Sequence, residues 1–214
     1  MYRAVIFDLD GTLVDAYPGI HQSLNEMLRE LQLPDVDLQT VKRRVGRGVV
    51  NLMQQSVPSE MVSRALELFR KSYDNTHLSG TFLLPEVREI LEALRKRNIS
   101  LGIASNKPAD FTRNILKYLQ IDEYFCCCSG PEGQIQPKPH PSMLQHMMHE
   151  MGVSPEETLY VGDMTLDSET AKNAGVRLAL IGTGGHSKEE LRESRPDYFL
   201  ESLGDLVEII ERGS

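Results

Sequence analysis

The sequence predicts an α/β protein with a doubly wound parallel sheet and an all-helical insertion after the first strand. Short apolar runs alternate with amphipathic stretches over most of the chain, which is typical of parallel strands joined by crossover helices. The alternation breaks only near the N-terminus, where apolar residues recur at helical spacing. A length of 214 residues suits one large domain or a core with a modest insertion.

The expected strands are short and lie between helices. They cover residues 4–7, 99–104, 124–128, 158–161, 177–181 and 198–200. The helices that follow them are expected over residues 85–97, 108–119, 141–151, 165–174 and 203–211. Gly175 directly follows one of these helices, at the position where glycine commonly ends a helix.

The helical insertion is predicted from its apolar spacing and its breakers. Its periodic apolar residues are Leu24, Met27, Leu28, Leu31, Met61, Ala65, Leu68 and Phe69. Pro and Gly residues separate the two sets and mark turns between helices. We therefore predict a catalytic core from residues 1–16 and 79–214, and a helical cap from residues 17–78 that stands over the carboxyl edge of the sheet.

Composition and charge exclude several classes of partner. The chain carries 23 Lys and Arg against 31 Asp and Glu, a net charge of −8, which disfavours nucleic acid and anionic membranes. No apolar stretch approaches the roughly 20 residues that cross a bilayer. The first expected strand begins by residue 4 and leaves no room for a signal peptide, so we expect a cytoplasmic protein. The oligomeric state cannot be predicted from the sequence.

The cysteines and two histidines favour structural roles. Cys126, Cys127 and Cys128 are adjacent, and neighbouring strand residues point to opposite faces, so we expect them to pack in a core strand. His146 and His149 share one helix face, but a zinc site needs further ligands that the sequence does not offer there. We expect a packed or solvated helix face.

Two aspartates follow the first apolar run. Asp8 and Asp10 come directly after residues 4–7, and Gly11 breaks the pattern. Ligands of open α/β sheets bind at this end of the strands. Two such carboxylates repel each other unless a cation or a shared proton relieves them. The pair could bind a hard ion such as Mg²⁺ while one carboxylate attacks a substrate. The alternative is an ordinary acidic turn without a catalytic role.

Later expected strands also end in polar residues. These are Ser105, Asn106, Lys138, Asp163 and Asp167. Because the carboxyl ends of parallel strands share one edge, these side chains can converge on the aspartate pair. Carboxylates, a hydroxyl, an ammonium group and the backbone donors of a helix start are the parts of a phosphoryl-transfer site.

This constellation resembles the haloacid dehalogenase superfamily, in particular its phosphoglycolate phosphatase-like members with a helical cap. Residues 8–12 match the first motif, Ser105 the second and Lys138 the third. Asp163 and Asp167 match the fourth, so the resemblance covers essentially the whole chain. It implies a Rossmann-like core and a Mg²⁺-dependent phosphatase whose partner is a small phosphorylated metabolite.

The resemblance assigns the reacting and metal-binding groups. Asp8 would be the nucleophile and would form an aspartyl-phosphate. Asp10 would protonate the leaving oxygen and then deprotonate the water that hydrolyses the intermediate. Asp8 and Asp163 would bind Mg²⁺ through carboxylates, with the backbone carbonyl of Asp10 as a third ligand.

The remaining residues would support these groups. Lys138 favours the charged form of the nucleophile, and Asp167 acts through water or by orienting Lys138. Thr12, Ser105 and Asn106 are the expected phosphate-binding residues.

Arg47 is the candidate that binds the rest of the substrate. It lies between Gly46 and Gly48 in a chain that is acidic overall, and a guanidinium group can bind a carboxylate through two hydrogen bonds. A solvated basic loop is the alternative. If the contact exists, it favours a small phosphorylated carboxylic acid such as phosphoglycolate.

Several other functions stay open at this stage. A pyrophosphatase, a nucleotidase and a sugar-phosphate mutase share the same phosphoryl-transfer chemistry. A signalling or binding protein that accepts phosphate without turnover is an alternative of another class. Fold alone does not separate these functions.

Overall fold

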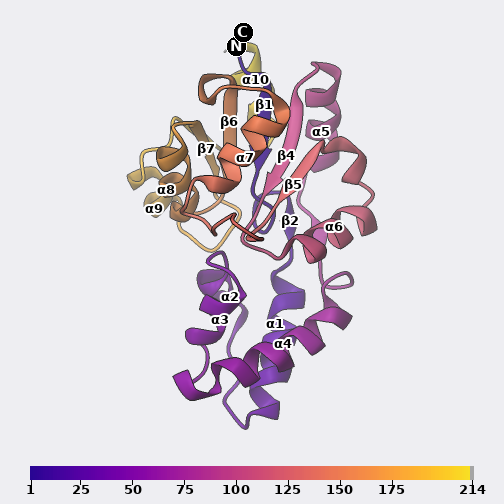
Figure 1. Cartoon of the computed structure of the whole chain (residues 1–214), viewed down its shortest axis with the longest axis vertical. Helices are drawn as coiled ribbons and strands as arrows, with labels where there is room; N and C mark the ends of the chain where they lie inside the picture. The colour runs from indigo at the N-terminus through magenta and orange to yellow at the C-terminus, as the bar shows by residue number, and fades with distance from the viewer. Residues whose placement is uncertain (213–214) are drawn as a thin grey trace.

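The computed structural model describes residues 1–212 and consists of an α/β core that carries a helical cap (Figure 1). The six strands of the core sheet are all parallel and lie in the order β5-β4-β1-β6-β7-β8. Their bounds are β1 Ala4–Phe7, β4 Ser100–Ala104, β5 Cys127–Ser129, β6 Thr158–Gly162, β7 Arg177–Ile181 and β8 Tyr198–Leu200. The predicted fold class is confirmed.

Helices cover both faces of this sheet. They are α5 Val87–Lys96, α6 Ala109–Tyr118, α7 Ser142–Met151, α8 Thr165–Ala174, α9 Lys188–Glu193 and α10 Asp205–Arg212. Val5 and Phe7 of β1 pack in one apolar cluster with residues of α5, α6 and α10. Ile6 points to the opposite face and packs in a second cluster with residues of α7, α8 and α9. This alternation along β1 follows from the two-residue period of a strand.

The strand order reverses at β1. From β1 the chain passes to β4 and then β5 on one side, and it returns to β6, β7 and β8 on the other side. In open sheets such a reversal separates the loops at the carboxyl ends of the strands and opens a crevice for a ligand. The loops after β1, β4 and β6 therefore surround one position.

The cap is built from four helices, α1 Tyr17–Glu30, α2 Leu38–Arg44, α3 Val49–Gln54 and α4 Val62–Thr76, and a short 3₁₀ helix, Ser59–Met61. Leu24 and Leu28 of α1 pack with Leu68 and Phe69 of α4, at the spacing that the sequence analysis used. In Figure 1 the cap lies beyond the carboxyl end of β1, on the side away from both termini. The boundary at residues 17–78 remains a prediction, and the cap helices lie within it.

The two connections between core and cap are held together. The short strands β2 (Val14–Asp15) and β3 (Phe82–Leu83) pair antiparallel, one on each connection. Beyond them the amide of Gly19 donates to the carbonyl of Gly80 at 3.1 Å. A methyl group on Gly80 would meet the Cα of Gly19 at 2.4 Å, so the connections approach at a distance that only glycine permits.

The expected strand at residues 124–128 is displaced in the structure. A 3₁₀ helix, Asp122–Tyr124, includes the first residue of the expected strand, and β5 begins only at Cys127. The cysteines are unpaired, as expected, but Cys126 is exposed and Cys128 is half-buried. Cys127 and Cys128 pack against the apolar clusters on opposite faces of the sheet, as predicted. Cys126 does not, and within residues 1–212 β5 is an edge strand that pairs only with β4.

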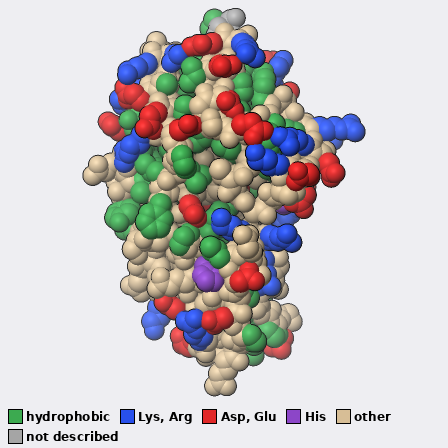
Figure 2. Space-filling model, turned by 180° about the vertical axis from the view of Figure 1, so that it is seen from behind, with side chains coloured by type: hydrophobic (Ala, Val, Ile, Leu, Met, Phe, Trp, Pro, Cys, Tyr) green, Lys and Arg blue, Asp and Glu red, His purple; other side chains and the backbone are tan. Residues whose placement is uncertain are grey.

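The visible surface carries charges of both signs. Figure 2 shows acidic and basic side chains intermingled over the visible face of the molecule. Over residues 1–212, no helix combines the length and apolar character that crossing a bilayer demands.

We predict that Gly80→Ala lowers the free energy of unfolding by about 1–3 kcal/mol, because the added methyl group forces the two connections apart. Thermal and urea denaturation measure this loss. Gly182→Ala is the control, since its methyl group would meet the flexible side chain of Lys188 at 3.2 Å and Phe199 only at an ordinary contact distance of 3.8 Å. Equal stability of the two variants would contradict the proposed constraint.

Candidate active site

Lys138 lies at the centre of the site with its ammonium group buried. Its Nζ is 3.0 Å from Oδ2 of Asp8 and 2.8 Å from Oδ1 of Asp167. It also donates to the hydroxyl of Tyr160 at 3.0 Å. Burial alone would lower the pKa of Lys138, but the two carboxylates outweigh it and raise that pKa. Lys138 therefore stays charged and fixes one oxygen of Asp8.

Asp8 emerges from the end of β1 into a buried environment. Its backbone amide donates to the carbonyl of Val161 at 2.8 Å, which continues the pairing of β1 with β6. Burial, together with the charges of Asp167 and Asp10, raises the pKa of Asp8 to about 6, although Lys138 lowers it. Lys138 therefore offsets only part of the cost of burying the ionised Asp8 carboxylate.

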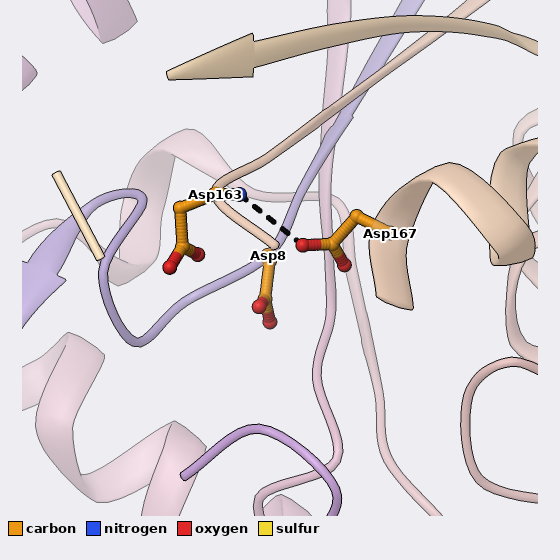
Figure 3. Close-up of side chains that lie close together, drawn as sticks. All are labelled: Asp8, Asp163 and Asp167. Carbon is orange, nitrogen blue, oxygen red and sulfur yellow. Dashed lines mark hydrogen bonds between the residues drawn. The ribbon is translucent and has the colours of Figure 1, made fainter. Parts of the chain in front are cut away.

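Asp163 and Asp167 come from the loop after β6 and the first turn of α8. Figure 3 shows both carboxylates beside that of Asp8, with Asp167 turned back to the amide of Asp163. Asp167 Oδ2 accepts from the amides of Asp163 and Met164 at 3.1 and 3.0 Å. Its Oδ1 accepts from Lys138 and from Tyr160 at 2.8 and 2.7 Å. Asp167 is therefore saturated, and its carboxylate acts as a fixed support for Lys138.

The other carboxylates have oxygens free for a cation. Ligand oxygens of Asp8, Asp163 and Asp167 lie within 4.8 Å of one another. Thr12 holds Oδ1 of Asp163 at 2.9 Å, while Oδ2 of Asp163 and Oδ1 of Asp8 are buried without a hydrogen-bond partner. A methyl group on Gly184 would meet Oδ2 of Asp163 at 1.7 Å, so glycine keeps the space beside this oxygen open.

The charge balance of the site favours a divalent ion. Its four aspartates, Asp8, Asp10, Asp163 and Asp167, face two buried lysines, Lys107 and Lys138. Burial, together with the charges of Asp8 and Asp167, raises the pKa of Asp163 well above its usual value. Carboxylate oxygens are the ligands that hard ions such as Mg²⁺ prefer. The donor set therefore fits a hard divalent cation between Asp8 and Asp163.

Asp10 takes part in a second buried ion pair. Lys107 Nζ lies 2.9 Å from Oδ2 of Asp10, and the lysine side chain is only 5% exposed. The same Nζ donates to the hydroxyl of Tyr73, from cap helix α4, at 2.6 Å. Burial alone would lower the pKa of Lys107, but Asp10 and Tyr73 outweigh it and raise that pKa. Asp10 Oδ1 is buried without a partner and lies beside the cavity.

Ser105 and Asn106 follow β4 and line the same cavity. Ser105 Oγ accepts from the amide of Lys107 at 3.3 Å. The amide nitrogen of Asn106 donates to the carbonyl of Gly46 at 2.9 Å, while its oxygen accepts from the amide of Lys138 at 2.8 Å. Asn106 therefore ties the cap loop and the Lys138 loop to the core.

Arg47 is the predicted site residue that the structure does not bring to the cavity. Its side chain is exposed, and the cavity is lined by its neighbours Gly46 and Gly48. Both glycines have positive φ, 114° and 85°, so the backbone of this loop, and not the arginine side chain, faces the cavity. From the cap it is Arg70 of α4 that adds a guanidinium group to the lining.

Comparison with known proteins identifies the family. The model of the haloacid dehalogenase-like hydrolases matches residues 5–181. The chain belongs to this family. The phosphoglycolate phosphatase of Escherichia coli (strain K12) is 33% identical over 229 aligned positions, which cover 96% of this chain and 91% of that protein. The phosphoglycolate phosphatase of Photorhabdus laumondii is 34% identical over 215 positions, covering 97% and 92%.

Solved structures agree with this assignment. The crystal structure of a predicted phosphoglycolate phosphatase from Haemophilus somnus 129PT superimposes with a TM-score of 0.92 at 27% identity, with 98% of each chain covered. A haloacid dehalogenase-like hydrolase from Bacteroides fragilis gives a TM-score of 0.90 at 26% identity. The predicted enzyme class is confirmed: this haloacid dehalogenase-like hydrolase is a phosphoric monoester hydrolase.

Sequence reasoning assigned no role to three residues of this candidate site. Lys107 directly follows Ser105 and Asn106, so its position after β4 was a usable signal. Tyr160 lies within β6 and Tyr73 within the cap, where a buried tyrosine looks like an ordinary core residue. Only the structure reveals that their hydroxyls contact the two lysines.

We predict that Asp8→Asn stabilises the cation-free protein at pH 7.5 by about 1–3 kcal/mol relative to wild type. The pKa of Asp8 in the fold, about 6, lies above its unfolded value. Asp8 therefore favours folding below about pH 4, and this contribution is lost as the pH rises through 6. Urea denaturation in EDTA from pH 4 to 7.5 measures the effect.

The matched control is Asp37→Asn. A backbone hydrogen bond from Thr40 lowers the pKa of Asp37, so its contribution to stability has the opposite dependence on pH. A constant difference between wild type and Asp8→Asn across the pH range would contradict the burial argument.

Proposed function

We propose that the chain is a Mg²⁺-dependent phosphatase that hydrolyses a small phosphomonoester, phosphoglycolate foremost, through an aspartyl-phosphate on Asp8. The observation that carries this proposal is the state of the Asp8 carboxylate. Lys138 binds one of its oxygens at 3.0 Å, and the other is buried without a partner beside Asp163. A carboxylate held in this way lines a cavity between core and cap, where a phosphate ester can reach it.

The proposed reaction has two steps. An oxygen of Asp8 forms a bond to phosphorus, the bond to the leaving oxygen breaks, and Asp10 gives that oxygen a proton. Asp10 then takes a proton from water, which attacks the phosphorus and releases phosphate and free Asp8. The hydroxyl of Ser105 and the backbone amides that follow it supply donors for the phosphate oxygens.

Magnesium fits the donor set of this site. The carboxylates of Asp8 and Asp163 would hold it, together with the backbone carbonyl of Asp10. When bound, it neutralises negative charge on the phosphate oxygens. Thr12 and Gly184 support this assignment, because one fixes Asp163 by a hydrogen bond and the other leaves room beside its free oxygen.

A small leaving group is supported by the cap. The cavity is bounded by the cap loop at Gly46 and Gly48 and by Phe69 of α4, so the region beyond the phosphate is limited. Several curated relatives are named phosphoglycolate phosphatases. We therefore place phosphoglycolate first among small phosphorylated metabolites. A pyrophosphatase, a nucleotidase and a sugar-phosphate mutase are the other outcomes that a screen can return.

A screen of phosphorylated metabolites tests the substrate directly. We expect phosphoglycolate to give the highest kcat/KM, with activity that requires Mg²⁺ and is abolished by EDTA. Ca²⁺ should inhibit, because its longer bonds and larger coordination number displace the attacking carboxylate. Phosphate release from phosphoglycolate, nucleoside monophosphates, hexose phosphates and pyrophosphate is the measurement. A preference for pyrophosphate or nucleotides, or full activity in EDTA, would overturn the proposal.

The roles of the two aspartates are tested by amide variants. Asp8→Asn should remove nearly all turnover on every substrate, because an amide cannot form the aspartyl-phosphate. Asp10→Asn should reduce hydrolysis of an alkyl phosphate more than that of p-nitrophenyl phosphate, whose leaving group scarcely needs a proton. If Asp8→Asn retains more than about a tenth of wild-type activity, the substitution raises the reaction barrier by less than ~1.4 kcal/mol. That result would exclude Asp8 as the nucleophile.

A further inference from the structure

The cavity above Asp8 is lined mainly by apolar side chains and has few cationic ones. Its apolar lining comes from Ile20, Val45, Val49, Leu52, Phe69 and Phe111. Among the described residues that line it, only Lys107 and Arg70 carry a positive charge. Lys107 is buried and Arg70 is exposed, so the cation that a substrate meets inside the cavity is Lys107.

Lys107 is held in place from both sides of the cavity. Its Nζ lies 2.9 Å from Asp10 on the core side and 2.6 Å from the hydroxyl of Tyr73 on the cap side. The ring of Tyr73 is itself fixed by two aromatic neighbours. Its centroid lies 5.3 Å from that of Phe69, on which it stacks, and 5.0 Å from that of Phe111. An ammonium group has three donors, and these two contacts leave one for a ligand.

The reaction proposed above does not use this charge. Lys138 already binds the Oδ2 of Asp8, and the phosphate oxygens have donors from Ser105 and the backbone. A lysine that served only to orient Asp10 would incur the desolvation cost of a buried ammonium, although a neutral donor could do the same. Its position at the wall of the cavity points to a ligand with a negative charge.

We propose that Lys107, positioned by Tyr73, binds a carboxylate on the leaving group of the substrate. This inference rests on the proposed phosphatase function and specifies its substrate class as 2-phosphooxy carboxylates. Asp10 would donate its proton to the ester oxygen, so a cation in contact with Asp10 lies close to that oxygen. In such a substrate the carboxylate is one carbon from the ester oxygen, within reach of the same ammonium group.

The placement also couples binding to the cap. Lys107 belongs to the loop after β4, whereas Tyr73 belongs to α4, whose end lies near the start of α6 (Figure 1). The ammonium group has both partners only when cap and core are together, because Asp10 and Tyr73 belong to different parts of the molecule. A carboxylate bound there would add a third contact across the same boundary.

The test compares phosphoglycolate with carbamoylmethyl phosphate, its neutral amide analogue of nearly the same shape. We expect wild type to prefer the carboxylate by at least tenfold in kcat/KM. Lys107→Met should reduce this preference to within about threefold, mostly through KM, and Lys107→Arg should restore part of it. Tyr73→Phe keeps the ring and should reduce the preference by about two- to tenfold.

Binding without turnover gives an independent measurement. In the Asp8→Asn background, calorimetry with Mg²⁺ should show that Lys107→Met weakens phosphoglycolate at least tenfold more than it weakens the amide. Near-ultraviolet circular dichroism and thermal unfolding verify that each variant is folded; if Lys107→Met is not, Lys107→Arg and Tyr73→Phe carry the comparison. The matched cation controls are Arg70→Gln and Arg47→Gln, each assayed for the same preference.

The outcomes separate this inference from the proposed function. Loss of activity on both substrates in equal proportion would assign Lys107 to the orientation of Asp10 and overturn the carboxylate site. Loss of the preference in Arg70→Gln or Arg47→Gln, with Lys107→Met unaffected, would place the carboxylate on that arginine. Absence of phosphatase activity in wild type on any phosphomonoester would instead refute the function itself.

Discussion

The buried surplus of negative charge at the carboxyl edge of the sheet is the constraint on which the site depends. Lys138 neutralises Asp8 and Asp167 only in part, and Asp163 has no ammonium partner at all among the described residues. A buried carboxylate without a counter-charge either binds a cation or takes up a proton. The raised pKa values of Asp8 and Asp163 show that, without a bound cation, these carboxyl groups take up a proton more readily than usual.

The fold creates this surplus by placing distant segments side by side. β1 and β6 are neighbours in the sheet, so Asp8 and Asp163 meet although 154 residues separate them in the chain. The residues that lead into α8 then supply amides to Asp167, which turns an acidic side chain into a rigid support for Lys138. Because each support is itself hydrogen-bonded, Asp8, the proposed nucleophile, needs little reorganisation when substrate binds.

Sequence reasoning succeeded where the determinants are local. Strand and helix periods predicted the sheet, and motif spacing predicted which loops carry Asp8 and Asp163. It misplaced the start of β5, because an apolar run does not show where a short strand begins, and it did not show that this strand lies at the edge of the sheet. The sequence also did not show that the Arg47 side chain points away from the cavity, since this follows from the loop conformation with positive φ at Gly46 and Gly48. The contact of Lys107 with Tyr73 joins two domains across 34 positions, and no local pattern specifies it.

The two buried lysines, Lys138 and Lys107, differ in where their partners lie. Among the described residues, the side-chain partners of Lys138 belong to the core, so the groups that we propose to act on phosphorus are held in place independently of the cap. Lys107 instead joins Asp10 of the core to Tyr73 of the cap. A change in cap sequence can therefore alter what lies around the leaving group while the geometry at Asp8 is preserved. Under the proposed function, phosphoryl transfer is a property of the sheet edge, and substrate choice is a property of the boundary between core and cap.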